Sequence, residues 1–408
     1  MPTDPTYLIV GASLCGAKAA ETLRSEGFGG TVILLGSETE RPYERPPLSK
    51  GYLLGKEDKS VIYVHEEGWY AEHGVDLRLG VTVTSVDPAG RTVTTADGDS
   101  VGYDRLLLAT GASPRRLAMP GADREGVLYL RTAGDSERLA AAFRGGGRVV
   151  TVGAGWIGLE TTAAAREAGC EVTVIEPEPT ALHRALGSEL GEMFADLHRE
   201  HGVEFRFGES VSEIRGPAGR VGEVVTSSGA ALPADIVVVG VGVVPNTGLA
   251  ADAGLEVSNG VVTDAALRTS DSGIYAAGDL ANSYHPRLGR RVRVEHWANA
   301  LSSGPAAARS MLGQDVTYDP VPYFFSDQYD LGMETAGLPE PGPYDQVLYR
   351  GDRPGREFIA FWLAGGAVVA GMNVNVWDVS DDIQALIRSG KKVDPARLTD
   401  PGVPLTEV

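Results

Sequence analysis

The sequence predicts an α/β fold built on parallel sheets, followed by a smaller α+β domain. Two stretches each run from a short β-branched strand through a small-residue turn into an Ala-rich helix, which predicts the parallel sheets. Beyond Pro320 the pattern changes to alternating strands and one helix over 380–389, which predicts the smaller domain. At 408 residues the chain is too long for one hydrophobic core, so two or three domains are expected.

The two glycine turns are the most informative motifs. The first spans Tyr7–Gly16 and reads Gly-x-Ser-x-x-Gly, and the second spans Val149–Gly158 and reads Gly-x-Gly-x-x-Gly, 142 positions later (153 − 11). Such a strand–turn–helix unit holds a pyrophosphate at the helix N-terminus, and Ser13 is small enough to allow the same approach. The sequence therefore predicts two Rossmann-like dinucleotide-binding domains in a glutathione-reductase-like arrangement, and a chain that carries electrons between two dinucleotides.

The remaining elements follow the same alternation. The insert over 81–104 is expected to form three antiparallel strands, because Asp97-Gly98 is a hairpin signal. The prolines of Arg41–Lys50 argue against regular structure there. The other expected elements are helix 16–26, strands 31–35 and 105–109, strand 148–152, helix 158–168, strand 171–175, a hairpin-rich insert over 203–232, strand 235–239, and strands 346–349, 357–362 and 367–372.

Composition excludes several classes of protein. The formal net charge of −19 argues against binding nucleic acid or an anionic membrane. No apolar run is long enough for a membrane span and no signal-peptide layout precedes the first strand, so a cytoplasmic protein is expected. Cys15 and Cys170 form no CxxC pair and are expected to be small core residues. The basic stretch Arg287–Arg293 is either a solvated loop or a docking surface for an acidic partner.

A carboxylate follows the second strand of each glycine-turn unit. Glu38 is placed to accept hydrogen bonds from an adenosine ribose, although a surface loop acid is the alternative. Glu176 lies 18 residues after Gly158 (176 − 158), where a carboxylate binds the ribose diol and repels a 2′-phosphate. The sequence therefore predicts a preference for NADH over NADPH, which the nearby Arg184 could complicate because an arginine can accept the phosphate.

Six further segments together carry a resemblance to a known family. The chain resembles the FAD-dependent NADH:ferredoxin reductases that serve putidaredoxin, rhodocoxin and the Rieske-type dioxygenase ferredoxins, over essentially its whole length and in order. The segments are Arg45–Lys50, Ala109–Gly111, Gly153–Glu160, Gly278–Asp279, Val294–Trp297 and Pro322–Gln328.

The resemblance implies a domain order and a set of cofactor contacts. It implies an FAD-binding domain over 1–113 and 241–319, an NADH-binding domain over 114–240 and a C-terminal α+β domain over 320–408. The implied FAD contacts are Gly11, Ser13, Leu14, Cys15, Gly16, Glu38, Arg45, Lys50, Val83, Ala109, Thr110, Gly111, Arg131, Gly278, Asp279 and Trp297. The implied NADH contacts are Gly153, Gly155, Ile157, Gly158, Glu160, Glu176, Gly242 and Glu295, and Arg184 is added to them because it lies near Glu176 in the sequence.

Lys50 and Glu160 are the predicted catalytic residues. By resemblance Lys50 lies near the reactive edge of the flavin, where a cation favours the anionic reduced ring; a solvated loop lysine is the alternative. Glu160 falls on the first turn of the second helix and can pair with Lys50 in the family. On the residues alone, a salt-bridge role is the safer interpretation of Glu160.

The cysteine count indicates the reaction class. No cysteine lies near Tyr43–Lys50, so no thiol relay can take electrons from the flavin, and nothing in the chain ligates a metal or a cluster. A flavin can accept a hydride and release electrons singly, so the expected acceptor is a small iron–sulfur ferredoxin that feeds a haem-thiolate monooxygenase or a ring-hydroxylating dioxygenase. The alternatives are a reductase of rubredoxin or quinone, and a flavin redox sensor like apoptosis-inducing factor, against which the acidity of the chain argues.

Overall fold

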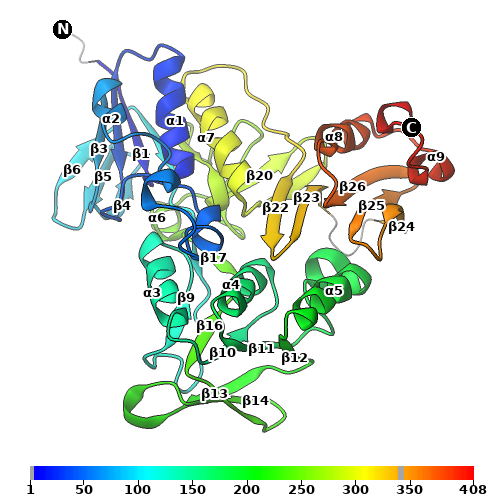
Figure 1. The fold of residues 1–408 in the computed structure, drawn as a ribbon. Coiled ribbons are helices and arrows are strands. Elements are labelled where there is room, and N and C mark those ends of the chain that lie inside the picture. The colour runs from blue at the N-terminus through cyan, green and yellow to red at the C-terminus, as the bar shows by residue number, and fades with distance from the viewer. Residues whose placement is uncertain (1–3, 339–343) are drawn as a thin grey trace. The chain divides into compact units, whose positions relative to one another are not determined.

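The computed structural model describes residues 4–338 and 344–408, which divide into two compact units (Figure 1). The first unit combines Met1–Glu44, Lys59–Ser113 and Val243–Pro320. The second combines Arg45–Asp58, Pro114–Gly242 and Val321–Val408. In the described part of the chain, no helix has the length and apolar character needed to cross a membrane.

The first unit is built on a five-stranded parallel sheet. Its strand order is β19-β7-β1-β2-β3, so β1 is the central strand. It runs parallel to both of its neighbours, β7 and β2. The inner strands β1, β2 and β7 are rich in Val, Ile and Leu and mostly buried, as strands covered on both faces require, whereas the edge strand β3 alternates between buried and exposed residues. The elements of the sheet are β1 (Thr6–Val10), β2 (Thr31–Leu35), β3 (Val75–Arg78), β7 (Arg105–Leu108) and β19 (Ile274–Ala276).

Two helices lie side by side on one face of this sheet, α1 (Leu14–Ser25) and α7 (Trp297–Met311) (Figure 1). They approach closely because Gly304 has no side chain: a Cβ there would lie 2.3 Å from the carbonyl oxygen of Cys15. The other face packs against smaller elements, among them an antiparallel sheet. These elements are β4 (Val83–Asp87), β5 (Thr92–Thr95), β6 (Ser100–Gly102), α6 (Gly248–Asp252), β18 (Val261–Thr263), β20 (Ala281–His285) and β21 (Arg290–Val292).

Short elements complete the first unit and the passage to the second. A four-residue helix, α2 (Trp69–Glu72), precedes β3, and η2 (Lys59–Ile62) and η4 (Gly278–Leu280) are single 3₁₀ turns. Strands β8 (Ala112–Pro114) and β17 (Val243–Pro245) pair with each other where the chain leaves the first unit and where it returns.

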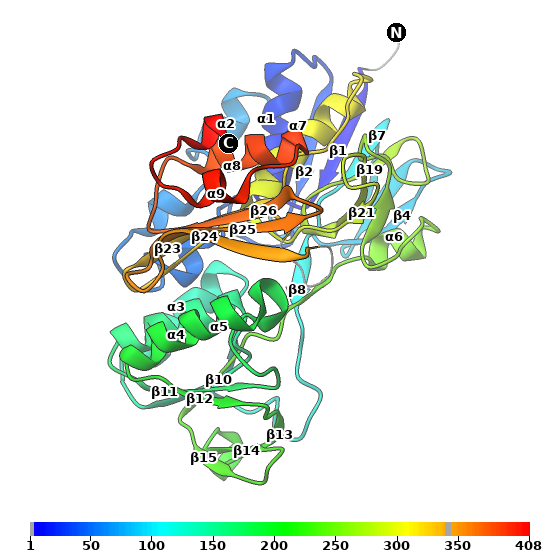
Figure 2. The same cartoon turned by 90° about the vertical axis from the view of Figure 1, so that its right-hand side faces the viewer.

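The second unit contains another five-stranded parallel sheet, in the order β12-β11-β10-β16-β9. Figure 2 shows its three helices together on one face, and the small sheet β13-β14-β15 covers the other. The strands are β9 (Val127–Tyr129), β10 (Arg148–Val152), β11 (Glu171–Glu176), β12 (Glu204–Phe207), β13 (Val211–Arg215), β14 (Glu223–Thr226), β15 (Ala231–Pro233) and β16 (Ile236–Val239). The helices are α3 (Ala133–Phe143), α4 (Trp156–Glu167) and α5 (His183–Glu200), and η3 (Pro217–Gly219) is a 3₁₀ turn.

The C-terminal part of the second unit is an antiparallel sheet, in the order β22-β23-β26-β25-β24. Its apolar residues join those of α4 and α5 in one continuous core that includes Phe194, Met333 and Trp362. The elements are β22 (Tyr323–Gln328), β23 (Leu331–Gly337), β24 (Gln346–Asp352), β25 (Glu357–Ala364), β26 (Ala367–Val374), α8 (Ser380–Ser389), α9 (Pro395–Thr399) and η5 (Leu405–Glu407).

The predicted fold class is confirmed, and several local expectations are wrong. The segment Arg41–Lys50 was expected to be irregular, but it contains the 3₁₀ turn η1 (Pro46–Ser49), because proline is compatible with the first position of a helical turn. The insert over 203–232 begins with β12, a strand of the parallel sheet, and only its later part is antiparallel. Helices α1 and α4 each begin two residues earlier than expected, because the extended backbone of Ser13 and of Gly155 forms their N-caps.

Candidate active site

The first glycine turn, in the first unit, leaves no room for larger residues. The φ angle of Gly11 is +123°, and a Cβ at this position would lie 2.2 Å from the carbonyl oxygen of Ala109. A Cβ at Gly16 would lie 2.1 Å from the carbonyl oxygen of Gly11, so the helix sits directly on the turn. The side chain of Ser13, the N-cap of α1, makes no capping hydrogen bond to the helix. The turn therefore presents the N-terminal amides of α1 in the way that binds a phosphate.

The turn Gly278–Leu280 lies against the same end of α1. Gly278 has a φ of +73°, and a Cβ there would lie 3.4 Å from the side chain of Cys15. Ser303 fixes this approach, since its hydroxyl accepts from the amide of Gly278 at 3.0 Å. Burial raises the pKa of the Cys15 thiol to about 12. Gly11–Gly16, Ala109 and Gly278–Asp279 thus form one neighbourhood, and its close backbone contacts fit the pyrophosphate of FAD.

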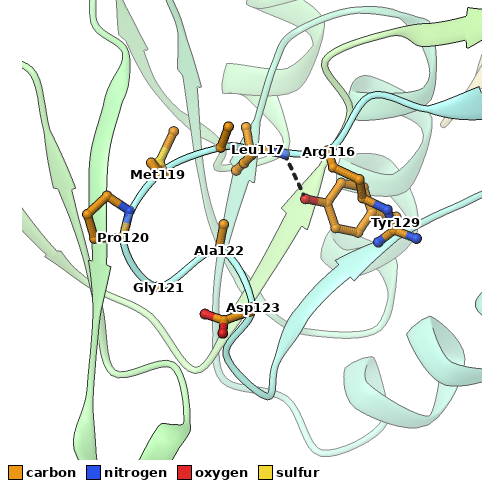
Figure 3. Close-up of a pocket in the computed structure, with 9 residues that line it drawn as sticks. Arg116, Leu117, Met119, Pro120, Gly121, Ala122, Asp123 and Tyr129 are labelled. Carbon is orange, nitrogen blue, oxygen red and sulfur yellow. Dashed lines mark hydrogen bonds between the residues drawn. The ribbon is translucent and has the colours of Figure 1, made fainter.

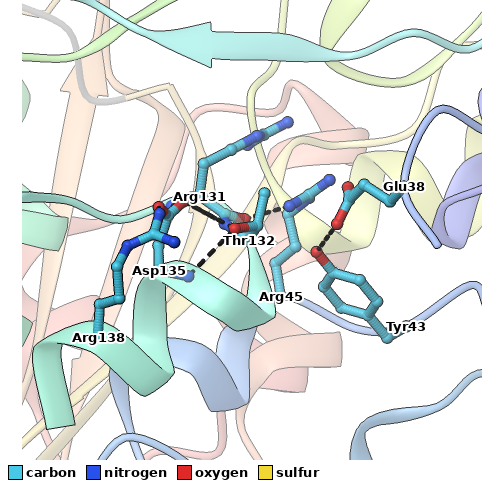
Figure 4. Close-up of polar contacts among 7 residues, drawn as sticks. All are labelled: Glu38, Tyr43, Arg45, Arg131, Thr132, Asp135 and Arg138. Atoms are coloured by element: carbon cyan, nitrogen blue, oxygen red, sulfur yellow. Dashed lines mark hydrogen bonds and ion pairs between the residues drawn. The ribbon is translucent and has the colours of Figure 1, made fainter. Parts of the chain in front are cut away.

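Other predicted FAD contacts of the first unit have hydrogen-bond partners that the sequence did not indicate. The hydroxyl of Tyr43 donates to Oε2 of Glu38 at 2.6 Å, which orients that carboxylate (Figure 4). The side-chain amide of Asn246 donates to the carbonyl of Thr110 at 2.8 Å. Trp297 begins α7, and its indole nitrogen donates to Glu44 at 3.2 Å. Val83 is the first residue of β4, in the antiparallel sheet rather than in the glycine-turn neighbourhood.

Arg45 and Arg131, two further predicted FAD contacts, adjoin each other in the second unit (Figure 4). The guanidinium of Arg45 donates to the backbone carbonyl of Arg131. The amides of Arg131 and Thr132 donate to Oδ2 of Asp135, at 3.1 and 2.8 Å, and Thr132 and Asp135 form the capping box of α3. The capping box therefore fixes the start of α3 next to Arg131, and Arg45, the N-cap residue of η1, donates to this segment.

The second glycine turn repeats the geometry of the first within the second unit. Gly153 has a φ of +98°, and a Cβ there would lie 2.5 Å from the carbonyl oxygen of Gly240, at the end of the neighbouring strand β16. A Cβ at Gly158 would lie 2.1 Å from the carbonyl oxygen of Gly153, and Gly155 is the N-cap of α4. Ile157 is exposed on the first turn of α4. The carboxyl ends of two adjacent parallel strands thus meet here, which is where such sheets bind ligands.

Glu176 and Arg184, both predicted NADH contacts, have different partners. Glu176 accepts from the amide of Ala154 at 2.7 Å with one oxygen and from the amide of Glu178 at 2.9 Å with the other. The strand-end carboxylate is therefore fixed on the glycine turn. Arg184 forms an ion pair with Glu178 at 2.6 Å and does not pair with Glu176. Gly242 follows β16 with a φ of +89°, whereas Glu295 belongs to the first unit and pairs with Arg293.

The predicted catalytic residues form a buried ion pair in the second unit. Nζ of Lys50 lies 2.6 Å from Oε1 of Glu160, and the side chain of Glu160 is only 5% exposed. Two hydroxyl groups also donate to this carboxylate, Ser49 to Oε2 and Ser326 to Oε1, the latter at 2.7 Å. Lys50 lies over the ring of Phe325, 5.5 Å from its centroid. The salt bridge expected for Glu160 is thus present, and the lysine is not a solvated loop residue.

The partners of Glu160 on β22 were missed by the sequence analysis. Pro322–Gln328 was recognised only as a family segment, yet it forms the edge strand β22, and Ser326 and Gln328 are both buried in it. Their period-two spacing along β22 was an available signal, because polar residues on the buried face of a strand need partners.

The loop before β9 has a separate pocket that contains none of the predicted site residues. Its volume is about 670 Å³, and in Figure 3 the hydroxyl of Tyr129 accepts from the amide of Leu117 at 3.1 Å. The guanidinium of Arg116 lies over the Tyr129 ring, 4.1 Å from its centroid. No catalytic chemistry is indicated by this set of side chains.

The fold and the two glycine-turn sites define an oxidoreductase with two nucleotide-binding domains, and comparisons with known proteins identify the family. The chain belongs to the pyridine nucleotide-disulphide oxidoreductase family, whose model matches residues 5–304, and the model described as "Reductase C-terminal" matches residues 323–408. It is therefore an oxidoreductase that uses FAD and NAD(H), as the sequence predicted.

Relatives match the chain over nearly its full length. It is 39% identical over 406 residues to the ferredoxin–NAD(+) reductase component of the anthranilate 1,2-dioxygenase system of Burkholderia cepacia, covering 99% of both chains. It is 40% identical to rhodocoxin reductase of Rhodococcus erythropolis, covering 91% of this chain and 86% of the relative. Its fold matches the crystal structure of the covalent putidaredoxin reductase–putidaredoxin complex with a TM-score of 0.95 at 35% identity, over 99% and 98% of the two chains. The resemblance stated from the sequence is confirmed.

Proposed function

We propose that this protein is an NADH-dependent, FAD-containing reductase of a small iron–sulfur ferredoxin, which in turn serves a haem-thiolate monooxygenase or a ring-hydroxylating dioxygenase. One observation carries the proposal: each unit has its own glycine-turn nucleotide site, and ferredoxin reductases of oxygenase systems match the chain from end to end. The need for cytoplasmic NADH favours the cytoplasm as its place of action.

Each unit would hold one nucleotide at its own glycine turn. Gly11–Gly16, Glu38 and Gly278–Asp279 would hold FAD, and Gly153–Gly158 with Glu176 would hold NADH. FAD, when bound, accepts a hydride and releases electrons one at a time. The ion pair with Glu160 holds the Lys50 ammonium in one place, so that its positive charge is oriented before the reaction begins.

The cysteines support transfer to an external carrier rather than to a thiol of this chain. Cys15 is in the first unit and Cys170 is in the second, and both are buried. Burial raises the pKa of each thiol, which keeps both groups protonated and unreactive at neutral pH.

Acceptor-dependent turnover tests the proposed function. The holoprotein is given NADH and cytochrome c, with and without a [2Fe–2S] ferredoxin, and cytochrome reduction is followed. We expect fast reduction only when the ferredoxin is present. Reduction supported by a rubredoxin or a quinone but by no ferredoxin would assign a different acceptor, and a reduced protein that ignores every carrier would indicate a redox sensor.

Lys50→Met tests the proposed catalytic role of the ion pair. We expect anaerobic reduction of the flavin by NADH to slow by roughly tenfold to a hundredfold, because a preoriented charge is lost, while NADH affinity changes less. Stopped-flow measurement at several NADH concentrations separates the two effects. Lys56→Met is the matched control, since Lys56 lies six residues further and forms an exposed ion pair with Glu167. An unchanged rate of flavin reduction in Lys50→Met would contradict the catalytic role of Lys50.

A further inference from the structure

We propose that His198, Gln328 and Ser326 are positioning residues: they form a buried chain of hydrogen-bond donors that fixes the position of the Glu160 carboxylate and thereby holds Lys50. Its consequence for flavin reduction through Lys50 rests on the proposed function, whereas the hydrogen-bond network belongs to the described structure of the second unit.

The chain of hydrogen bonds runs from α5 through β22 to α4. Nε2 of His198 lies 2.9 Å from Oε1 of Gln328, and Nε2 of Gln328 donates to Oγ of Ser326 at 3.1 Å. Ser326 then donates to Glu160 at 2.7 Å. The exposed fractions are 0% for His198, 1% for Gln328 and Ser326, and 5% for Glu160, so water competes little for these groups. Each buried polar group must therefore find its partner within the chain.

The chemistry of the groups gives the chain one direction. A carboxylate only accepts, so the hydroxyl of Ser326 points toward Glu160 and its oxygen must accept from Gln328. The amide nitrogen of Gln328 can donate but cannot accept, and its carbonyl oxygen accepts from Nε2–H of His198. Nδ1 of His198 then faces the hydroxyl of Tyr329 at 3.3 Å. An imidazole that donates from Nε2 and accepts at Nδ1 is neutral. Burial lowers the pKa of His198 to about 4, which agrees with this form.

Lys50 and Ser49 complete the contacts of Glu160. Lys50 lies against Oε1 and Ser49 donates to Oε2, so the chain that ends in Ser326 is one of three contacts that hold this carboxylate.

Other titratable groups surround the network. Asp327 on β22 interacts electrostatically with both Lys50 and Glu160, and burial raises the pKa of its carboxyl. His201 at the C-cap of α5 disfavours a second positive charge on His198. The test therefore has to follow Glu160 itself rather than the activity alone.

Isotope-edited infrared spectroscopy tests the proposal on the holoprotein without NADH. With ¹³C-labelled glutamate, the Glu160 carboxylate band is the one that Glu160→Gln removes, and its frequency reports the hydrogen bonds that this carboxylate accepts. We expect S326A to shift this frequency, because the carboxylate loses one of its donors. Q328E should shift it in the same direction, since a carboxylate at 328 draws the Ser326 hydroxyl away from Glu160. The matched control is Ser212→Ala, whose hydroxyl donates to backbone carbonyls on β14.

A double variant separates the chain from a simple charge effect. If Gln328 acts through Ser326, Q328E should add little to the shift of S326A. Fully additive shifts would overturn the role of Gln328. An unchanged band frequency with a lowered melting temperature would show that the network contributes only to packing. The infrared frequency is independent of hydride transfer, so a Lys50→Met variant with normal flavin reduction would contradict the catalytic role alone.

Discussion

At the residue scale, Glu176 shows how a strand-end carboxylate is held in place before a nucleotide arrives. Both of its oxygens accept backbone amides, and one of these, at Ala154, belongs to the glycine turn. The carboxylate therefore lies at the turn that would hold the NADH pyrophosphate. Arg184, which could have favoured NADPH, is paired with Glu178.

We expect Glu176→Gln to narrow the preference for NADH over NADPH. A hydrogen bond to a charged group contributes about 1.5–3 kcal/mol, so the ratio of kcat/KM values should fall by roughly tenfold to a hundredfold. Steady-state kinetics with both nucleotides gives this ratio. Glu178→Gln is the informative comparison, because it removes the same charge two residues away and releases Arg184. A larger effect in Glu178→Gln would show that Arg184 reads the ribose phosphate.

The sequence predicted the glycines of the nucleotide turns more directly than the buried polar residues of the site. Glycines in tight turns were predictable, because Gly11 and Gly153 have positive φ angles that other residues rarely adopt. The pair of Lys50 and Glu160 was expected only through resemblance, since 110 residues separate them (160 − 50). Ser326 and Gln328 were missed because their period-two spacing indicates a polar, buried strand face but not which residues that face contacts.

At the element scale, α5 connects the nucleotide domain to the C-terminal sheet. The hydroxyl of Tyr349 donates to Glu189 at 2.9 Å, Arg356 pairs with Glu200 at 2.5 Å, and His201 stacks on Tyr329 at a centroid distance of 3.6 Å. The sequence analysis did not identify this helix. Gly187 interrupts its helical backbone with a φ of 78° and a ψ of 177°, and glycine weakens a helical pattern.

Burial of His198 on this helix makes stability depend on pH. Its folded pKa of about 4 lies below the ordinary value of 6.5, so between these values the unfolded chain binds a proton that the folded chain does not. The contribution of the neutral His198 to the free energy of unfolding is therefore fully present above about pH 6.5. It falls as the pH decreases toward 4, by up to about 3 kcal/mol.

His198→Gln should make the pH dependence of stability shallower in this range. Urea unfolding of the holoprotein at pH 7.5, 6 and 5 measures it. Gln retains a donor for Gln328 but has no titratable group. His73→Gln, at the exposed end of α2, is the control and should leave the slope near that of the parent protein. An equal slope in the parent and in His198→Gln would assign the acid sensitivity to other groups.

At the scale of the whole molecule, the sequence predicted the individual sheets better than it predicted which segments belong to the same compact unit. The repeated strand–turn–helix pattern predicts both parallel sheets, because it consists of contiguous residues. The segment Arg45–Asp58 clusters with the second unit through contacts over long sequence separations, such as Ser136 to the carbonyl of Leu48 at 2.8 Å and Tyr52 to Glu137 at 2.7 Å. The predicted domain boundaries remain a prediction, since pattern alone does not show such contacts.

The charge of the whole molecule bears on how it meets a ferredoxin. With a net charge of −19, the chain as a whole repels an acidic partner, so association needs a local basic surface. The stretch Arg287–Arg293 forms part of the β20–β21 hairpin, and its arginines are not equivalent. Arg287 pairs with Asp319 at 3.3 Å, and Arg293 is mostly buried and pairs with Glu295. Arg290 and Arg291 lie on the exposed strand β21, where Arg291 donates to carbonyls on neighbouring strands.

Reversing Arg290 and Arg291 to Glu should therefore lower the ferredoxin-dependent rate more than Arg287→Glu does, because the field of Arg287 is already balanced by Asp319. We expect a decrease of roughly threefold to tenfold at low salt that becomes smaller as salt screens the charges. Cytochrome c reduction over a series of ionic strengths measures this, and ferricyanide reduction by NADH should change much less. Equal losses with both acceptors would indicate damage to the flavin site. An unchanged rate with both would make the hairpin a solvated surface, and the ferredoxin would then have to be recognised by shape and apolar contact instead of charge.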